Sequence, residues 1–93
     1  MKEYSLRMLT TETKPLDGEF AESLRTGETL SSAAATHTPP SGTALSLSPS
    51  VSGTVGMVQF GTGSLVRGWH TVTMLCTGSQ GTKEAVVWQI NVS

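Results

Sequence analysis

The sequence predicts an all-β fold: an immunoglobulin-like (Ig-like) β-sandwich of about 6–8 strands, with an N-terminal arm and one short helical turn. Ser and Thr supply 26 of the 93 residues, and Gly and Pro another 14, which favours short strands and turns over helices. Alternating apolar runs are separated by turn signals along the chain. This length suits one domain, so we expect residues 1–14 to form an N-terminal arm or edge strand and residues 15–93 to form the sandwich.

The N-terminal segment alternates weakly. Tyr4, Leu6 and Met8 fall on one side of residues 3–9, which predicts an edge strand or an extended arm, broken at Lys14-Pro15 because proline cannot donate to a sheet. The segment lacks the apolar stretch of a signal peptide.

Residues 17–27 are the helical candidate. Asp17 can cap its start, Phe20 and Leu24 are spaced i,i+4, and Gly27 can end it. Because so short a helix is marginal by itself, we expect one or two turns held by Phe20 and Leu24.

Short strands and turns fill the middle of the chain. We expect strands over residues 28–38, 43–48 and 54–60. The turns are expected at residues 39–42, 49–53 and 61–68. Leu45 and Leu47 should point inward, as should Val58 and Phe60.

Residues 68–92 predict a hairpin. Val72, Met74 and Cys76 are the apolar set of its first strand, and Val86, Trp88, Ile90 and Val92 are that of its second. Pairing Met74 with Val86 places both sets on one face and leaves Ser79-Gln80-Gly81 as a three-residue loop, whose last residue favours a left-handed glycine. The opposite face carries Trp69, Leu75 and Val87, which are our candidate protein–protein contacts.

Charge is distributed unevenly. The net charge is −1, and ten of the thirteen charged residues lie in residues 1–28, whereas residues 29–66 contain none. The net charge gives no basic footprint for nucleic acid, and no apolar run approaches the ~20 residues that span a membrane. The uncharged stretch has two interpretations, an ordinary Ser/Thr-rich surface or a face covered by neighbouring subunits.

Catalytic and cofactor signatures are absent from the sequence. Two histidines, His37 and His70, and one cysteine do not make the four-ligand pattern of structural zinc, and Asp17 is the only Asp available to a Ser/His/Asp triad. The glycine-rich runs at 61–64 and 78–81 lack the glycine-lysine pair of a phosphate loop. We therefore expect no enzyme, cofactor or metal. We expect His70 to hydrogen-bond nearby backbone at the start of its strand, a corner role that Tyr takes in Ig-like sandwiches.

Several short motifs resemble a known family. They are FAESLRTGETLSS at 20–32, THTPPSG at 36–42, VQFG at 58–61, and the run from His70 to Gly81 followed by a final Ile-x-Val strand. Across roughly residues 14–92 these resemble small phage proteins of the fiber-tail adaptor family. The chain departs from that family in having Phe20 and Leu24 where many members use Trp, and His70 where Tyr is frequent.

The resemblance implies a single Ig-like sandwich and a non-enzymatic virion structural protein. Such a protein is made in the host bacterial cytoplasm, sits on the phage tail or neck, and bridges to fibers or neighbouring tail proteins and to copies of itself in a symmetric oligomer. The alternative is a capsid decoration or glycan-binding Ig-like module on the head surface, for which Trp69 and Trp88 would supply the aromatic platform.

Overall fold

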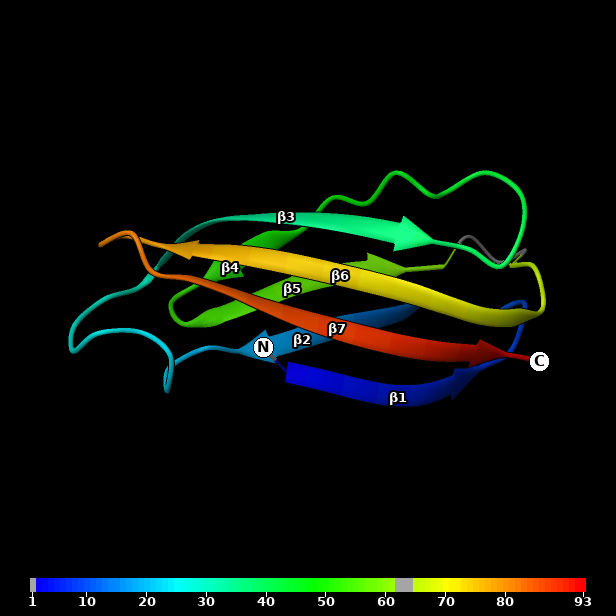
Figure 1. Ribbon diagram of the computed structural model, residues 1–93, viewed down its shortest axis with the longest axis horizontal. Helices are drawn as coiled ribbons and strands as arrows, with labels where there is room; N and C mark the ends of the chain where they lie inside the picture. The colour runs from blue at the N-terminus through cyan, green and yellow to red at the C-terminus, as the bar shows by residue number, and fades with distance from the viewer. Residues whose placement is uncertain (1, 62–64) are drawn as a thin grey trace.

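Seven strands form a sandwich of two sheets in the computed structural model, which describes residues 2–61 and 65–93 (Figure 1). The strands are β1 (Lys2–Met8), β2 (Lys14–Glu19), β3 (Leu30–Thr38), β4 (Ser50–Ser52), β5 (Val55–Phe60), β6 (Gly68–Gly78) and β7 (Lys83–Val92). One sheet has the order β1-β7-β6-β3 and the other β2-β5-β4. The all-β sandwich predicted from the sequence is therefore confirmed, with seven strands within the expected 6–8, and no helix occurs among the described residues.

The predicted hairpin is confirmed in its register. Met74 pairs with Val86 and Val72 with Trp88 in the antiparallel β6–β7 ladder. Gly81 has a φ of 90°, a left-handed conformation that costs a glycine little. Its N–H donates to the carbonyl of Gly78 at 3.1 Å, which closes the three-residue loop.

The N-terminal segment is an edge strand. β1 runs parallel to β7, with Lys2 opposite Val86 and Met8 opposite Val92. Only 2% of Met8 is exposed, so β1 contributes to the core. The strand ends well before Lys14-Pro15, and Pro15 lies inside β2. That strand is the edge of its own sheet, where a proline is tolerated.

The expected helix over residues 17–27 was wrong. Asp17 and Glu19 belong to β2, where they pair with Met57 and Val55 of β5. The turn expected at Phe20 and Leu24 does follow, with the Leu24 N–H donating to the Phe20 carbonyl at 3.2 Å, and a second turn brings the Glu28 N–H to the Arg25 carbonyl at 2.9 Å. The i,i+4 spacing of Phe20 and Leu24 thus marks a single turn after a strand, because the long-range pairing of β2 outweighs a weak local helical preference.

The strand expected at residues 43–48 was also wrong. These residues pair with no strand in the described part of the chain, although Leu45 and Leu47 do pack against the core as the alternation predicted. The turn expected at residues 49–53 instead contains the short strand β4, and the actual turn lies at Gly53-Thr54. Part of the loop expected at residues 61–68, namely 62–64, lies outside the described residues.

The core fills the space between the two sheets. It includes the whole apolar set predicted for the hairpin: Val72, Met74, Cys76, Val86, Trp88, Ile90 and Val92. Facing them from the other sheet are Leu16, Val58 and Phe60, with Phe20 from the following turn. Gly18 and Gly56 pair across β2 and β5, and a Cβ at Gly56 would stand 2.8 Å from the Cys76 sulfur. The two glycines therefore let the sheets approach closely.

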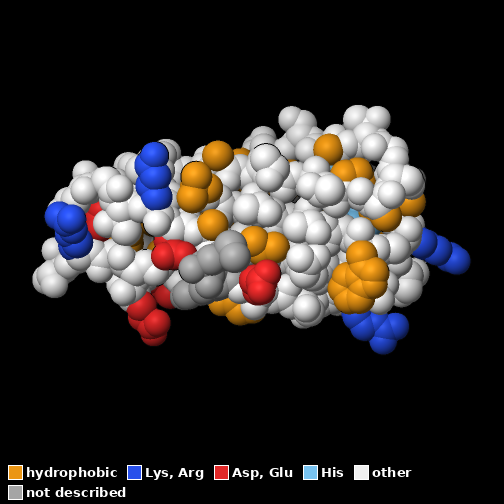
Figure 2. Space-filling view, in the orientation of Figure 1, with side chains coloured by type: hydrophobic (Ala, Val, Ile, Leu, Met, Phe, Trp, Pro, Cys, Tyr) orange, Lys and Arg blue, Asp and Glu red, His pale blue; other side chains and the backbone are white. Residues whose placement is uncertain are grey.

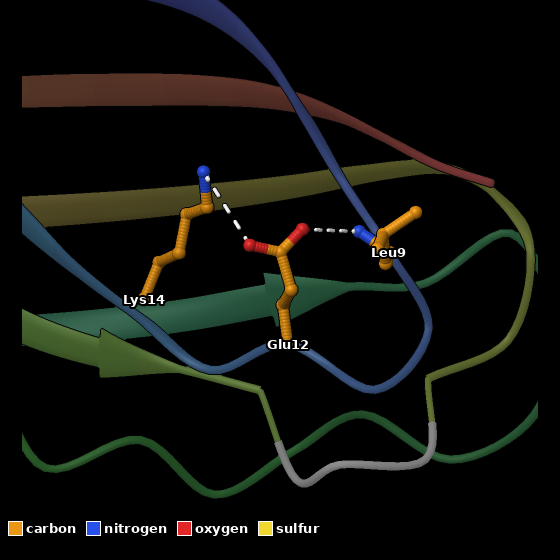
Figure 3. Close-up of polar contacts among 3 residues, drawn as sticks. All are labelled: Leu9, Glu12 and Lys14. Carbon is orange, nitrogen blue, oxygen red and sulfur yellow. Dashed lines mark hydrogen bonds and ion pairs between the residues drawn. The ribbon is translucent and has the colours of Figure 1, made fainter.

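A polar connection joins β1 to β2 (Figure 3). The Leu9 N–H donates to Glu12 Oε1 at 2.7 Å, and Lys14 Nζ lies 3.7 Å from Glu12 Oε2. Glu12 thereby fixes the turn by which the chain passes from one sheet to the other.

Candidate functional site

Charged strands and uncharged strands lie on opposite sides of the sandwich. β1 and β2, along the lower side in Figure 1, contain exposed charges such as Glu3, Arg7, Asp17 and Glu19. β3 and β4, along the upper side, contain none, and neither does β6. One interpretation of the uncharged stretch at residues 29–66 was a single covered face. The structure shows instead that its strands belong to both sheets. The stretch supplies β3 to one sheet and β4 and β5 to the other, and wraps around one side of the molecule.

The outer face of the four-stranded sheet holds the three candidate contact residues. Trp69 and Leu75 lie on β6 and Val87 on β7, all facing away from the core. Trp69 is 57% exposed and Leu75 43%, whereas Val87 is only 9% exposed. Val87 is therefore not available as a large contact, although it shares the face of the other two. Trp69 and Leu75, six residues apart, are separated by about 20 Å.

The strand neighbours of Leu75 are small and uncharged. Leu75 pairs with Ala34 on β3 and Ala85 on β7. Between Leu75 and Trp69, the Thr71 hydroxyl donates to Gln89 Oε1 at 2.8 Å. In Figure 2, which views this sheet from outside, the charged side chains lie toward the two ends and in the lower half of the view. The face therefore offers two separated apolar side chains among polar and small residues.

Across the sheet from Trp69 lie a carboxamide and a guanidinium. Trp69 pairs with Asn91 of β7, which pairs with Arg7 of β1. By contrast, Trp88 is 4% exposed and belongs to the core. Trp88 therefore lies in the core, as the hairpin register predicted, and the aromatic platform of the alternative hypothesis cannot include both tryptophans, because their positions on adjacent strands have opposite parity.

Glu28 is a buried acid with a structural role. It is 3% exposed, and its carboxylate accepts hydrogen bonds from the Arg25 N–H at 2.9 Å, the Gln80 N–H at 2.8 Å and the Thr82 hydroxyl at 2.7 Å. These bonds, chiefly that of the Arg25 backbone, lower the pKa of Glu28 to about 2. Glu28 thus joins the turn before β3 to the β6–β7 loop.

Two histidines meet in the interior, a pairing that the sequence alone did not predict. His37 Nε2 lies 2.8 Å from His70 Nδ1, and the rings are stacked with centroids 5.1 Å apart. His37 is 7% exposed and His70 1%. His70 Nε2 also lies 2.6 Å from the Val66 carbonyl oxygen, the backbone contact expected for His70.

The described residues bring together no group of side chains suited to a metal ion. Residues 2–61 and 65–93 contain no group of three or more His, Cys, Asp or Glu side chains suited to a metal ion. They also contain no helix able to cross a membrane. A hollow of about 210 Å³ beside β2 and β5 is lined by Pro15, Ser48, Ser50, Met57, Val58 and Gln59. None of its lining residues is ionisable, so it offers no acid or base for chemistry.

No protein-family model and no curated protein matches this chain.

Proposed function

We propose that this protein is a non-enzymatic virion structural protein of a tailed phage, an adaptor on the tail or neck that bridges to fibers or neighbouring tail proteins. The exposure of Trp69 and Leu75 on β6, which like its neighbour β3 contains no charged residue, is the observation that carries the proposal. We assign the outer face of β6 and β3 as the contact surface, with its partners being other tail, neck or fiber proteins and copies of the same chain.

The physical support comes from what surrounds these two side chains. Trp is among the residues that most often dominate the binding energy of interfaces, and interface cores are depleted of charge. A solvent-facing sheet ordinarily carries charges that discourage association. Here β3 and β6 have none, so little electrostatic work opposes the burial of this face against a partner. The motif resemblance supplies the biological setting.

The decisive experiment measures incorporation into particles. In a phage deleted for this gene, the chain is supplied from a plasmid, and purified particles are quantified by mass spectrometry. We expect the wild-type chain at a fixed copy number. We expect the Trp69→Ala/Leu75→Thr variant to be incorporated at least tenfold less, because each truncation of an interface anchor costs more than about 1 kcal/mol. Absence of the wild-type chain from particles would refute the proposal.

Met57→Thr is the matched control. Met57 is 38% exposed and lies on the outer face of the other sheet. It should be incorporated normally, and both variants should unfold at the wild-type urea concentration. Equal loss for the two variants would show that the four-stranded sheet has no special role.

Self-association gives a second readout. If copies cover one another, the melting temperature should rise with protein concentration by mass action. A midpoint that is unchanged over a hundredfold dilution would remove the oligomer from the proposal and leave only contacts with other proteins.

The alternative is a head-surface module that binds glycans, and one observation favours it. Trp69 is exposed, with Asn91 opposite it on β7 and Arg7 on the next strand across, and an aromatic ring in the same row as an amide and a cation is suited to a sugar ring with polar substituents. Glycan-array binding that is lost in Trp69→Ala, together with head localisation, would favour this alternative. Tail localisation without glycan binding would exclude it.

A further inference from the structure

The two buried histidines have a single consistent proton arrangement. The Leu45 N–H can only donate, and it lies 2.9 Å from His37 Nδ1, so this nitrogen accepts. At the other end the Val66 carbonyl can only accept, so His70 Nε2 carries a proton. In neutral rings His37 Nε2 then carries the remaining proton and donates to His70 Nδ1. Both ends independently fix the direction of the bond between the rings.

This chain of hydrogen bonds has no place for another proton. A proton added at His37 Nδ1 would face the Leu45 N–H, and one added at His70 Nδ1 would face the N–H of His37. Either addition would place two N–H donors less than 3 Å apart, and the hydrogen bond between those two nitrogens would be lost.

We propose that His37 and His70 form an acid-released latch that holds residues 43–49 against the edge of β3. In Figure 1 this segment leaves the end of β3 and runs back beside it, and the Leu45–His37 hydrogen bond fixes the two together. Residues 43–49 pair with no strand among the described residues. Together with the half-buried side chains of Leu45 and Leu47, the latch therefore holds the segment in position. The inference does not depend on the proposed function.

The described residues that pack against the pair are uncharged, so none of them stabilises an added proton. Phe60 from β5 packs edge-on against His37 with ring centroids 4.9 Å apart. The lining from the two loops is uncharged: Pro39, Ser41, Thr43, Leu45, Leu65 and Val66. Val72 pairs with His37 and Ile90 with His70, which completes an apolar environment.

Two charged residues occur in the chain segments nearest the pair. Arg67, next to Val66, is exposed and is a cation. Glu12 lies in the turn that contacts Leu65 through the Thr10 carbonyl, but its carboxylate is bound to the Leu9 N–H and to Lys14. Burial, and then the charge of His70, lowers the pKa of His37. Protons therefore bind more readily to the open state, in which residues 43–49 have left β3, than to the closed state, in which the Leu45–His37 hydrogen bond is made.

Hydrogen exchange of the Leu45 amide tests the latch. Because a histidine in the open state titrates near pH 6.5, uptake of one proton on opening should reduce the protection factor of this amide about tenfold between pH 7.5 and 5.5. The amides of Met74 and Val86, in the central hairpin, should keep their protection factors. Unchanged protection at Leu45 over this range would overturn the proposal.

A variant and a spectrum complete the test. His37→Asn retains an oxygen that can accept from Leu45 but removes the titration, so the protection at Leu45 should lose its pH dependence. A tenfold dependence that persists in this variant would contradict the latch. Nitrogen-15 spectra of the wild-type protein at pH 7.5 should show both rings neutral and protonated at Nε2, and protonation of either ring at Nδ1 would overturn the assigned hydrogen bonds.

Discussion

Gly56→Ala tests how closely the two sheets approach, and a second substitution, Cys76→Ala, should partly restore the lost stability. The new Cβ would stand 2.8 Å from Cys76 Sγ and 3.0 Å from Met74 Cε. Met74 can yield, since its contacting atom is the end of a flexible side chain. Cys76 is 1% exposed on a central strand and cannot move away freely.

The expected magnitude follows from two opposing effects. Overfilling a packed core costs about 1–3 kcal/mol. Gly56 does not have a positive φ, so alanine is compatible with its backbone and returns about 0.4–1 kcal/mol through the unfolded chain. We expect a net loss of about 1–2 kcal/mol for Gly56→Ala. Cys76→Ala, which deletes one buried atom, should cost about 1 kcal/mol.

Together the two substitutions should cost less than their sum. The methyl group at position 56 then occupies space vacated by the sulfur, so we expect a favourable coupling of about 1–2 kcal/mol.

Urea unfolding followed by the fluorescence of buried Trp88 measures all four members of the cycle. With a slope of about 1 kcal/mol per molar, Gly56→Ala should lower the midpoint by about 1–2 M. Gln59→Ala, on the exposed face of the same strand, is the control and should change stability by less than about 0.5 kcal/mol. Additivity within about 0.5 kcal/mol would refute the contact between Gly56 and Cys76.

Three further results are expected. Stability should fall with pH in two stages. The first begins below about pH 6.5, since the lowered pKa of His37 makes the unfolded chain bind more protons, and His37→Asn should remove it. The second, between pH 4.5 and about 2 as Glu28 is protonated, should be absent in Glu28→Gln, and a single-stage urea titration would contradict this assignment. Gly81→Ala should cost about 1–2 kcal/mol from its backbone conformation alone, since its Cβ would meet nothing within 4 Å, and a stability equal to wild type in thermal melts would count against the left-handed loop. Gly78→Ala should lower the melting temperature, because its Cβ would collide with the Glu28 carboxylate, and an unchanged amide spectrum for Gln80 and Thr82 would show that this collision does not occur.

The hairpin was predictable because its information is local. Parity of apolar residues and the preference of a three-residue loop for Gly81 both specify the pairing of Met74 with Val86. Because the outward parity follows from this register, the placement of Trp69, Leu75 and Val87 on one face was predictable too. Their exposed fractions depend on neighbouring strands and were not.

Features that depend on distant pairing could not be read from the sequence. The i,i+4 spacing of Phe20 and Leu24 suggested a helix, since nothing near residues 17–19 reveals that β5 will pair with them. Likewise His37 and His70 each fit an ordinary strand. Their contact follows only from the β3–β6 register, which puts His37 opposite Val72, two residues from His70 on the same face. The alternation at residues 43–48 correctly predicted the inward side chains but could not supply a partner strand.

The parallel pairing of β1 with β7 imposes an order on folding. Lys2 pairs with Val86, 84 residues later, so β1 must wait for its partner strand until the chain between them has been made. Until then Leu6 and Met8 have no sheet to join, and closing so long a loop is slow compared with forming the β6–β7 hairpin. The nascent chain therefore passes through a stage in which the edge of β7 is unpaired and the partly apolar β1 segment has not joined a sheet. Chaperone binding and mispairing between neighbouring nascent chains would be concentrated in that interval.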